Sequence, residues 1–440
     1  MKKIKRRTMS LLCLVLIIAA GLSFYTFRLF TKGGEWATFS SNQTVFSEGE
    51  LIIGSIFDRN GMLLASSDGD ERIYAEDSDI RKATLHAVGD AAGNVGTGAL
   101  TVFSSELIGY DPINGAYSVG NSGGEVHLSI DGELNAVALD ALDGRKGTVA
   151  ISNYETGEIV CMVSTPTYDP YYPPEDLGDD SYEGVFINRF LSSTYTPGST
   201  FKLVTLTAAI ENLSDLYDRT FICEGQVTIG ENVITCTGYH GEINIEEALA
   251  VSCNCAFGEL AAEIGSETLA EYADKLGFTS SINIDGINTA AGYYEKTPNI
   301  GETAWSGIGQ YKDMINPAAM LRFVGAIANN GVATDLTLKR EGSWGGKRIL
   351  KNPTAEKLSE MMNFNVHYNY GTGNYPGLEL YAKSGTAEVG EDKDTHALFV
   401  GFIKDAEHPY AFVVIIENGG SGSYVAGPVA NTVLQAAVNS

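Results

Sequence analysis

The sequence contains a serine and a lysine spaced as a nucleophile and its base would be. Ser199 and Lys202 belong to the one Ser-x-x-Lys of the chain, and residues i and i+3 lie on the same face of a helix. An amine beside a hydroxyl accepts its proton and makes the serine a nucleophile for acyl transfer. Pro197 and Gly198 predict a turn that sets Ser199 at the N-terminal end of a helix, where backbone N–H groups favour negative charge.

Two further short motifs offer groups that acyl transfer needs. Ser252-Cys253-Asn254 supplies a hydroxyl that would relay a proton and an amide that would hold a substrate peptide group. Lys383-Ser384-Gly385-Thr386 falls on an expected strand, where the glycine would let a ligand backbone come close. Each motif by itself also fits a surface pair on a helix or a solvated lysine on an edge strand, so the combination is what indicates a site.

The elements that must position these motifs follow a pattern of strands, helices and strands again. Strands are expected over 126–130, 148–153, 158–164, 378–388, 397–403 and 411–417, and helices over 131–142, 199–212, 245–264, 267–276, 317–329 and 425–438. Asn316 and Pro317 provide an N-cap and a first helical residue. Strands at both ends with helices between them predict an α+β domain whose single sheet is assembled from both ends of the segment.

A shorter, glycine-rich stretch precedes this domain. Residues 51–57 and 62–65 flank the turn Asp58-Arg59-Asn60-Gly61 and predict a β-hairpin. The Gly123-Gly124 pair then marks a break. We therefore expect residues 33–123 to form a small β-containing module and residues 124–440 to form the main domain.

Residues 1–32 are expected to be a cytoplasmic tail and a membrane anchor. The stretch 8–27 carries no charge and has about the length that a spanning helix needs. Five positive residues, at positions 2, 3, 5, 6 and 7, precede this stretch, and only Arg28 and Lys32 follow it closely. This imbalance predicts a cytoplasmic N-terminus and an external body. A cleaved signal peptide is the alternative, because Ala19-Ala20-Gly21 offers small residues, but the apolar stretch continues past that point.

The charge balance argues against a nucleic-acid partner. The chain of 440 residues has 29 Lys and Arg against 55 Asp and Glu, a net charge of −26. A protein this acidic has little with which to neutralise phosphates.

The cysteines and histidines give no expectation of a metal or another cofactor. Cys223 and Cys236 flank a β-rich loop that could bring them together in a disulfide, and separate thiols are the alternative. A four-cysteine zinc site is not expected, because Cys253-x-Cys255 lacks the usual two-residue spacer and no His-x3-5-His follows. The histidines are scattered without ligand spacing and are expected to be structural.

The three motifs in this order resemble the active-site set of the penicillin-binding proteins and serine β-lactamases. Other similar segments are Tyr195-Thr-Pro-Gly-Ser-Thr-Phe-Lys202, Gly307-Ile-Gly-Gln310, Asn316-Pro317 and His396-Ala-Leu-Phe-Val-Gly401. The resemblance covers about residues 124–440 and, more loosely, 54–65, which is similar to a hairpin of class B members. It implies a penicillin-binding transpeptidase or serine β-lactamase-like fold, with an antiparallel sheet flanked by helices and an all-helical subdomain, and a pedestal-like or dimerisation role for residues 33–123.

The resemblance also implies roles for the site residues. Ser199 would attack a D-alanyl-D-alanine stem peptide, Lys202 would take the proton of the Ser199 hydroxyl, and Ser252 would pass a proton to the leaving amine. Asn254 would bond the substrate amide, and Ser384 would bind the terminal carboxylate beside Gly385. The N–H groups of Ser199 and Thr386 would form an oxyanion hole. To act at neutral pH, Lys202 needs a pKa about three units below that of a free lysine, and burial and the like charge of Lys383 would both lower it. Ser384 stands where the family usually has Thr, which keeps the hydroxyl.

The function that follows is a membrane-anchored, monofunctional D,D-transpeptidase that cross-links peptidoglycan and is acylated by β-lactams. Expected partners are stem peptides on lipid-linked precursors, β-lactams, the membrane and proteins of a cell-wall synthesis complex; a D-Ala-D-Ala carboxypeptidase side activity would use the same acyl-enzyme. A β-lactamase or penicillin sensor, and a catalytically silent assembly scaffold, are the alternatives. The region before residue 124 is too short for a glycosyltransferase domain, so glycan polymerisation is not expected.

Overall fold

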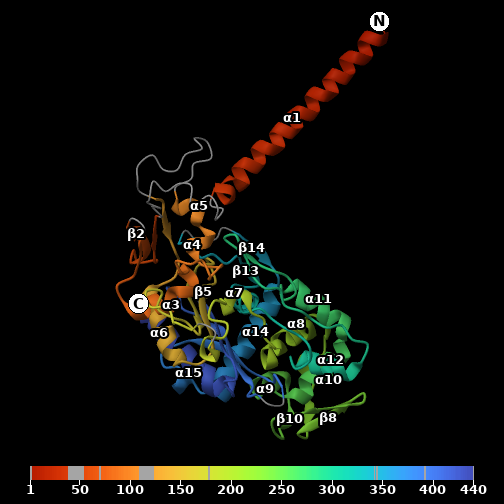
Figure 1. Ribbon diagram of the computed structural model, residues 1–440. Coiled ribbons are helices and arrows are strands. Elements are labelled where there is room, and N and C mark those ends of the chain that lie inside the picture. The colour runs from red at the N-terminus through yellow and green to blue at the C-terminus, as the bar shows by residue number, and fades with distance from the viewer. Residues whose placement is uncertain are drawn as a thin grey trace.

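A long N-terminal helix, α1 (Lys2–Ala37), projects from the rest of the chain (Figure 1). The computed structural model describes residues 2–37, 54–68, 71–108, 123–176, 179–340, 342, 345–390 and 393–439. Within these ranges α1 is the one helix long and apolar enough to cross a membrane, over Lys3–Gly33, and its most apolar part is not buried against the body. The expected anchor therefore lies inside a continuous helix of sufficient length.

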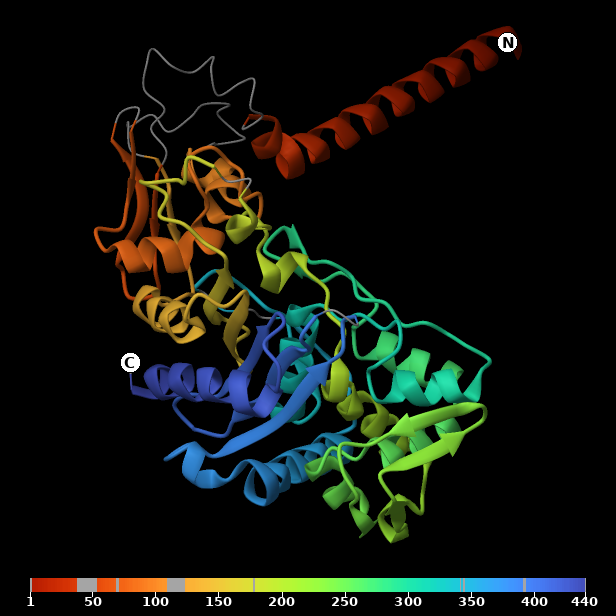
Figure 2. The ribbon, with the colours of Figure 1, turned by 60° about the horizontal axis from the view of Figure 1, so that its bottom comes forward.

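The centre of the body is a five-stranded antiparallel sheet with the strand order β15-β16-β17-β5-β6. Its strands are β5 (Gly147–Asn153), β6 (Ile159–Thr165), β15 (Leu380–Ala387), β16 (His396–Ile403) and β17 (Tyr410–Ile416). The register pairs Val413 of β17 with Ala150 of β5, which joins the two ends of the domain. Figure 2 shows these early and late strands side by side, and the expected sheet is confirmed.

Helices cover both faces of this sheet, so its strands are buried on both sides. Neighbouring residues of β5 point to opposite cores: Val149 and Ile151 pack with α6 (Gly132–Leu142) and α15 (Gly427–Asn439), and Ala150 packs with α13 (Pro317–Ala328). Near-continuous apolar strand sequences are what two covered faces require.

Most of the remaining helices pack on the α13 side of the sheet. These helices are α7 (Arg189–Ser192), η2 (Gly198–Phe201), α8 (Lys202–Asn212), η3 (Leu216–Asp218), α9 (Ile245–Ala250), α10 (Asn254–Ile264), α11 (Ser266–Lys275), α12 (Ile300–Gly307) and α14 (Asn352–Asn365), with η1 (Asp180–Tyr182) nearer the N-terminal part. Figure 1 shows α8, α10, α11 and α12 grouped together. The short segments η4 (Val366–Tyr370), η5 (Thr372–Asn374) and η6 (Gly422–Ala426) lie on the α15 side instead. The short strands of the helical part are β7 (Phe221–Cys223), β8 (Gln226–Ile229), β9 (Asn232–Thr235), β10 (Gly241–Ile243), β11 (Asn283–Ile284), β12 (Ile287–Asn288), β13 (Val332–Thr334) and β14 (Gly346–Arg348). The α+β architecture with a helical subdomain matches the expected fold class.

One expected helix is wrong as a single element. The run 245–264 is divided into α9 and α10, and Ser252 at the break has a left-handed φ of 54°. An apolar face continues through both helices, so periodicity alone does not reveal the break.

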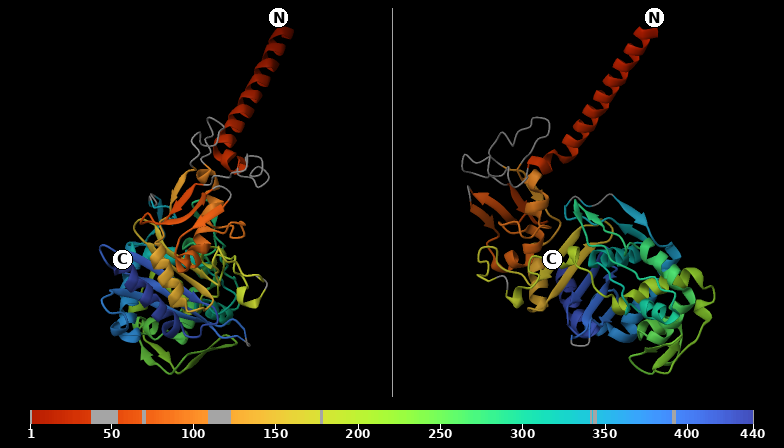
Figure 3. Two further views of the ribbon diagram at one scale, coloured as in Figure 1. Left: turned by 60° about the vertical axis from the view of Figure 1, so that its left-hand side comes forward. Right: turned by 45° about the vertical axis from the view of Figure 1, so that its right-hand side comes forward.

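A small sheet with the order β3-β2-β1-β4 lies between α1 and the main sheet, as Figure 3 shows. The expected hairpin is present as β1 (Ser55–Phe57) and β2 (Leu63–Asp68), followed by β3 (Glu71–Tyr74). Residues 51–53 of the expected first strand lie outside the described residues. β4 (Glu125–His127) adds in parallel to β1, so the sheet combines strands from both sides of Gly123-Gly124.

Three helices, α3 (Ser78–Val88), α4 (Ala99–Val102) and α5 (Ser104–Leu107), complete this region, and no sequence pattern had predicted them. Asp58 joins the hairpin to the main domain. Its buried carboxylate accepts hydrogen bonds from the N–H groups of Asn60 and Met62, both at 2.8 Å, and from the N–H of Gly132 at 3.1 Å. The carboxylate thus holds the turn and the start of α6 together.

Candidate active site

Ser199 and Lys202 meet at the junction of two helical segments. Ser199 lies in the 3₁₀ turn η2, and Lys202 is the first residue of α8. The Lys202 Nζ donates a hydrogen bond to the Ser199 Oγ at 3.1 Å. The i, i+3 spacing therefore brings the two side chains together, as the sequence predicts.

The other two motifs converge on the same two lysines. The Lys202 Nζ also donates to the Asn254 Oδ1 at 2.7 Å and to the backbone oxygen and Oγ of Ser252 at 2.7 and 3.1 Å. The Lys383 Nζ donates to the Ser252 Oγ at 3.1 Å and to the backbone oxygen of Ser384 at 2.8 Å. Ser252 thus stands between the two lysines, and no hydrogen bond joins Lys383 to Ser199 within the described part of the chain.

Both lysines are fully buried, and burial lowers the pKa of each. The pKa of Lys202 falls to about 8, because desolvation penalises its charged form. The pKa of Lys383 falls well below the ordinary value, first through burial and second through the charge of Lys202. Burial therefore makes the neutral form of each amine easier to reach than in a free lysine.

The loop between α9 and α10 presents Ser252 and Asn254 to Lys202. Ser252 adopts a left-handed φ of 54°, which costs energy in a non-glycine residue and occurs often at functional sites. The Asn254 side chain is held from the other side, since its Nδ2 donates to the Thr235 oxygen at 2.8 Å. This bond orients the Oδ1 toward Lys202.

Two glycines allow β15 to approach the nucleophile turn. Gly198 has a φ of 51°, and a Cβ there would lie 2.6 Å from the Thr386 oxygen. A Cβ on Gly385 would lie 2.9 Å from the Thr200 Cγ2. Only glycine permits contacts this close, so the backbones of Ser199 and Thr386 lie next to each other.

Gln310 bridges this junction, and it had been noted in the sequence without a role. Its Nε2 donates to the Thr386 oxygen at 2.8 Å, and its Oε1 accepts from the Glu388 N–H at 3.2 Å. The Gly198 N–H donates to the Gly309 oxygen at 3.0 Å. The segment that ends at Gln310 therefore ties the strand to the nucleophile turn.

Ser384 has a partner that sequence reasoning missed. The Tyr370 hydroxyl lies 2.8 Å from the Ser384 Oγ and accepts from the Ser384 N–H at 2.6 Å. Tyr370 is buried at the end of η4, fourteen residues before Ser384, and nothing in its sequence context points to the site. The exposed Thr386 lies on the same face of β15 as Ser384, two residues further along.

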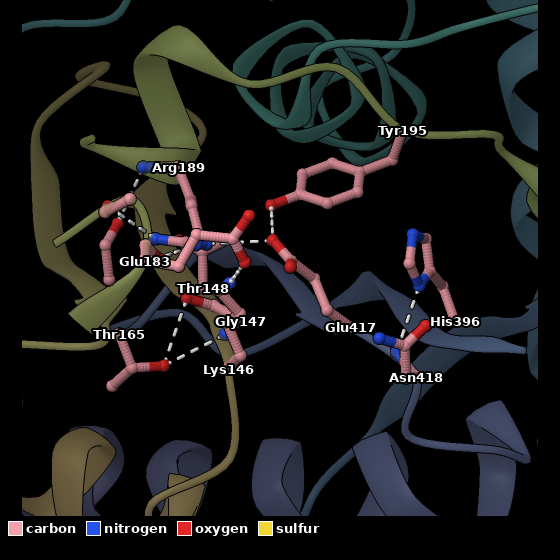
Figure 4. A network of polar contacts seen from close by, with 12 residues as sticks. Lys146, Gly147, Thr148, Thr165, Glu183, Arg189, Tyr195, His396, Glu417 and Asn418 are labelled. Carbon is pink, nitrogen blue, oxygen red and sulfur yellow. Dashed lines mark hydrogen bonds and ion pairs between the residues drawn. The ribbon is translucent and has the colours of Figure 1, made fainter. Parts of the chain in front are cut away.

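A polar network behind the turn fixes the segment that leads to Ser199 (Figure 4). The Glu417 Oε1 accepts from the Arg189 Nε at 2.8 Å and from the Tyr195 hydroxyl at 2.9 Å. The backbone of Tyr195 exchanges two hydrogen bonds with Ile315, each of 2.8 Å. The chain before Pro197 is therefore anchored to the end of β17 and to the start of α13.

The sequence left open whether Cys223 and Cys236 form a disulfide, and the structure shows that they do not. All six cysteines lie in described residues and are free thiols. The Sγ of Cys223 lies 3.7 Å from that of Cys255, and the Sγ of Cys236 lies 3.9 Å from that of Cys253. Four thiols therefore gather behind the Ser252–Asn254 loop.

Comparison with known proteins agrees with this geometry. Residues 147–435 match the family model described as the penicillin binding protein transpeptidase domain. The peptidoglycan D,D-transpeptidase PbpA of Mycobacterium tuberculosis is 28% identical over 359 residues, which are 72% of this chain and 73% of that protein.

Two solved structures share the fold. The ceftriaxone acyl-enzyme complex of penicillin-binding protein A from M. tuberculosis has a TM-score of 0.77 at 24% identity, over 89% of this chain and 99% of that chain. The penicillin-binding protein PBP2 in complex with MreC from Helicobacter pylori has a TM-score of 0.66 at 24% identity, over 72% of this chain and 64% of that chain. With the family model covering most of the body and the three motifs meeting around Lys202 and Ser252, this chain belongs to the penicillin-binding protein transpeptidase family.

Proposed function

We propose that this protein is a membrane-anchored serine D,D-transpeptidase that cross-links peptidoglycan stem peptides through an acyl-enzyme on Ser199, and that β-lactams acylate the same serine. The observation that carries the proposal is the hydrogen bond from the buried Lys202 to Ser199, completed by Ser252, Asn254 and Lys383. Relatives named peptidoglycan D,D-transpeptidases and a neighbour captured as a β-lactam acyl-enzyme support it.

Acylation would begin with Lys202 in its neutral form. Lys202 takes the proton of the Ser199 hydroxyl as the oxygen attacks the carbonyl carbon of the penultimate D-alanine. The N–H groups of Ser199 and Thr386 would stabilise the resulting oxyanion, and the close approach of Gly198 to the Thr386 oxygen supports this role. The proton then passes from Lys202 through the Ser252 hydroxyl to the leaving D-alanine amine, and the peptide bond breaks.

Deacylation would reverse these roles with a different amine. The amino group of a second stem peptide attacks the ester carbonyl and loses a proton to Lys202 through Ser252, and the Ser199 oxygen leaves with a proton. Asn254 would bond the donor peptide amide, and Ser384 to Thr386 would hold its terminal carboxylate. Transfer to water at the same ester would give the carboxypeptidase side activity.

The rest of the chain would place this chemistry at the cell wall. Residues 1–32 would carry a cytoplasmic tail and the anchor, residues 33–123 a pedestal-like module, and residues 124–440 the transpeptidase domain. The orientation follows from the positive residues before the apolar stretch. The PBP2 complex with MreC supports cell-wall assembly proteins as partners. Stem peptides on lipid-linked precursors would be the substrates.

Labelling with a fluorescent penicillin tests the proposal on the full-length protein in detergent. A long-lived adduct is expected for the native chain and for Ser181→Ala, a matched change at an exposed serine, but not for Ser199→Ala. Rapid turnover of the adduct would instead indicate a β-lactamase. No labelling of the native chain would indicate a silent scaffold.

A second assay separates transfer from hydrolysis. The protein is incubated with a stem peptide ending in D-alanyl-D-alanine and an excess of a D-amino acid, and the products are identified by mass spectrometry. We expect the exchanged peptide to dominate. A product that has only lost its terminal D-alanine would identify a carboxypeptidase and contradict the assignment of transpeptidation.

A further inference from the structure

Three cysteines and a histidine converge behind the loop that carries Ser252 and Asn254. Cys223, Cys236, His240 and Cys253 each offer one ligand atom, and these four atoms lie within 4.8 Å of one another. Three thiolates and one imidazole are a common ligand set of structural zinc sites. We propose that this cluster binds one Zn²⁺ ion, which braces the Ser252–Asn254 loop from behind.

The separations fit a tetrahedral ion. With Zn–S bonds of about 2.3 Å, two sulfurs of a tetrahedral site lie about 3.8 Å apart. The Cys236 and Cys253 sulfurs are 3.9 Å apart, and the His240 Nδ1 lies 3.6 Å from the Cys236 Sγ. Pairing the thiols as disulfides would give the imidazole no role, whereas a metal uses it as the fourth ligand.

The backbone holds the ligand-bearing segments in place. Cys223 ends β7, Cys236 follows β9, and His240 directly precedes β10. The His240 N–H donates to the Cys223 oxygen at 3.2 Å, and the Cys236 N–H donates to the Gly225 oxygen at 2.8 Å. Two ligand segments are thus tied to each other and the third to a nearby turn, so the ion meets an organised site.

Backbone N–H groups also point at the sulfurs. The Asn254 N–H donates to the Cys236 Sγ at 3.2 Å, and the Ala256 N–H donates to the Cys253 Sγ at 3.5 Å. Both donors belong to the first turn of α10, whose positive end favours negative charge. Such second-shell hydrogen bonds orient and stabilise metal-bound thiolates.

The position of Cys253 gives the site its consequence. Cys253 lies between Ser252 and Asn254, and both neighbours bond the Lys202 Nζ. A metal on Cys253 would therefore fix the loop geometry without touching the reacting atoms, so the four ligands are positioning residues. Metal binding is measured directly, and its outcome does not depend on whether the protein is a transpeptidase.

The test uses the full-length protein, purified in detergent with a reductant and equilibrated with Zn²⁺ or Co²⁺. We expect one zinc per chain by elemental analysis, and thiolate-to-cobalt charge-transfer bands for the Co²⁺ form. Cys253→Ser and His240→Ala should weaken metal binding by at least about tenfold. Cys161→Ser, at a buried cysteine in β6, and His127→Ala, at a histidine in β4, are the matched controls and should bind as the native chain does.

Removing the ion supplies a second readout. Chelation should slow acylation by penicillin about tenfold, and added Zn²⁺ should restore the rate. Native protein that binds no zinc and shows no cobalt–thiolate bands would overturn the proposal, even if the variants fail to fold. So would peptide mapping of protein isolated without reductant that finds Cys236–Cys253 and Cys223–Cys255 disulfides.

Discussion

Lys202 is the residue whose surroundings we expect to set the reactivity of the proposed site. Its ammonium is fully buried, yet oxygens from Ser199, Ser252 and Asn254 accept hydrogen bonds from it. Burial lowers its pKa to about 8, and electrostatic interactions with the nearby Cys236, Cys253 and Cys255 oppose part of that shift. The side chain is therefore close to the balance at which it both loses and regains a proton near neutral pH.

The acylation rate should follow the neutral fraction of Lys202. Below a pKa of about 8 the amine is mostly protonated and cannot accept the serine proton, so the rate should rise about tenfold per pH unit from pH 6 and level off above pH 8. The second-order rate constant with penicillin, measured from pH 6 to 9, checks this. Lys202→Arg should be inactive throughout, and a flat profile for the native chain would contradict the role of Lys202 as base.

Tyr370 should act through Ser384. Tyr370→Phe removes the hydroxyl that bonds both the N–H and the Oγ of Ser384, so the motif strand loses its orientation and acylation should slow by about tenfold. Tyr375→Phe is the control, because both rings pack on Phe399 but no hydrogen bond joins Tyr375 to Ser384 among the described residues. Equal penicillin acylation rates for the two variants would show that the hydroxyl has no such role.

At the scale of elements, the site depends on how closely the strand β15 approaches the turn η2. The approach is possible because Gly198 and Gly385 lack side chains at the contact. Gln310 then closes the junction by bonding both Thr386 and Glu388. Neither element forms the site alone, since Ser199 comes from the turn and Lys383 from the strand.

Gly198→Ala should separate these two elements. The new Cβ would meet the Thr386 oxygen at 2.6 Å, so β15 must move away from Ser199 and acylation should fall by at least about tenfold. Gly144→Ala is the matched control, with a similar φ of 71° and no atom within 4 Å of the added carbon. Both changes carry a left-handed backbone cost of about 1 kcal/mol, so only the acylation rate should distinguish them. Equal rates would contradict the close-approach argument.

At the scale of the whole molecule, the N-terminal region is joined to the main domain by buried polar contacts. Arg81 of α3 donates from its Nε and Nη2 to the two carboxylate oxygens of Asp169, at 2.8 and 2.6 Å. Both side chains are nearly buried, and the guanidinium keeps the pKa of Asp169 below its ordinary value. The Nε2 of the buried His86 bonds the Val185 oxygen at 2.7 Å, which adds a second contact between α3 and the same domain.

Arg81→Ala should destabilise the whole protein. The change leaves the Asp169 carboxylate buried without its partner, which costs about 3–5 kcal/mol. Lys82→Ala, at the next residue of α3, removes an exposed ion pair with Asp79 and a weak attraction to Asp169, and should cost less than about 1 kcal/mol. Urea unfolding followed by intrinsic fluorescence measures both. An equally small loss of unfolding free energy for the two variants would mean that the contact between Arg81 and Asp169 contributes little to stability.

The sequence predicted the elements that have strong local signals. The strands of the main sheet, α13 with its Asn316 cap and the β1–β2 hairpin follow from apolar runs, capping and turn residues. The helices α3, α12 and α14 were missed, because their polar and apolar residues are mixed and the packing of their neighbours stabilises them. Tyr370 was missed for a related reason, since a tyrosine after a helix has no local feature that marks it as part of a site.

The sequence by itself determined that Ser199 and Lys202 would meet, because they lie three positions apart and a helix places residues i and i+3 on one face. It also indicated acyl transfer, through the residue types and the order of the three motifs that begin at Ser199, Ser252 and Lys383. Only the tertiary structure decided that Lys383 reaches Ser252, that Tyr370 holds Ser384, and that three cysteines and a histidine gather behind the loop. Contacts between distant segments depend on strand register and on how helices pack, and these are set by the whole core rather than by neighbouring residues.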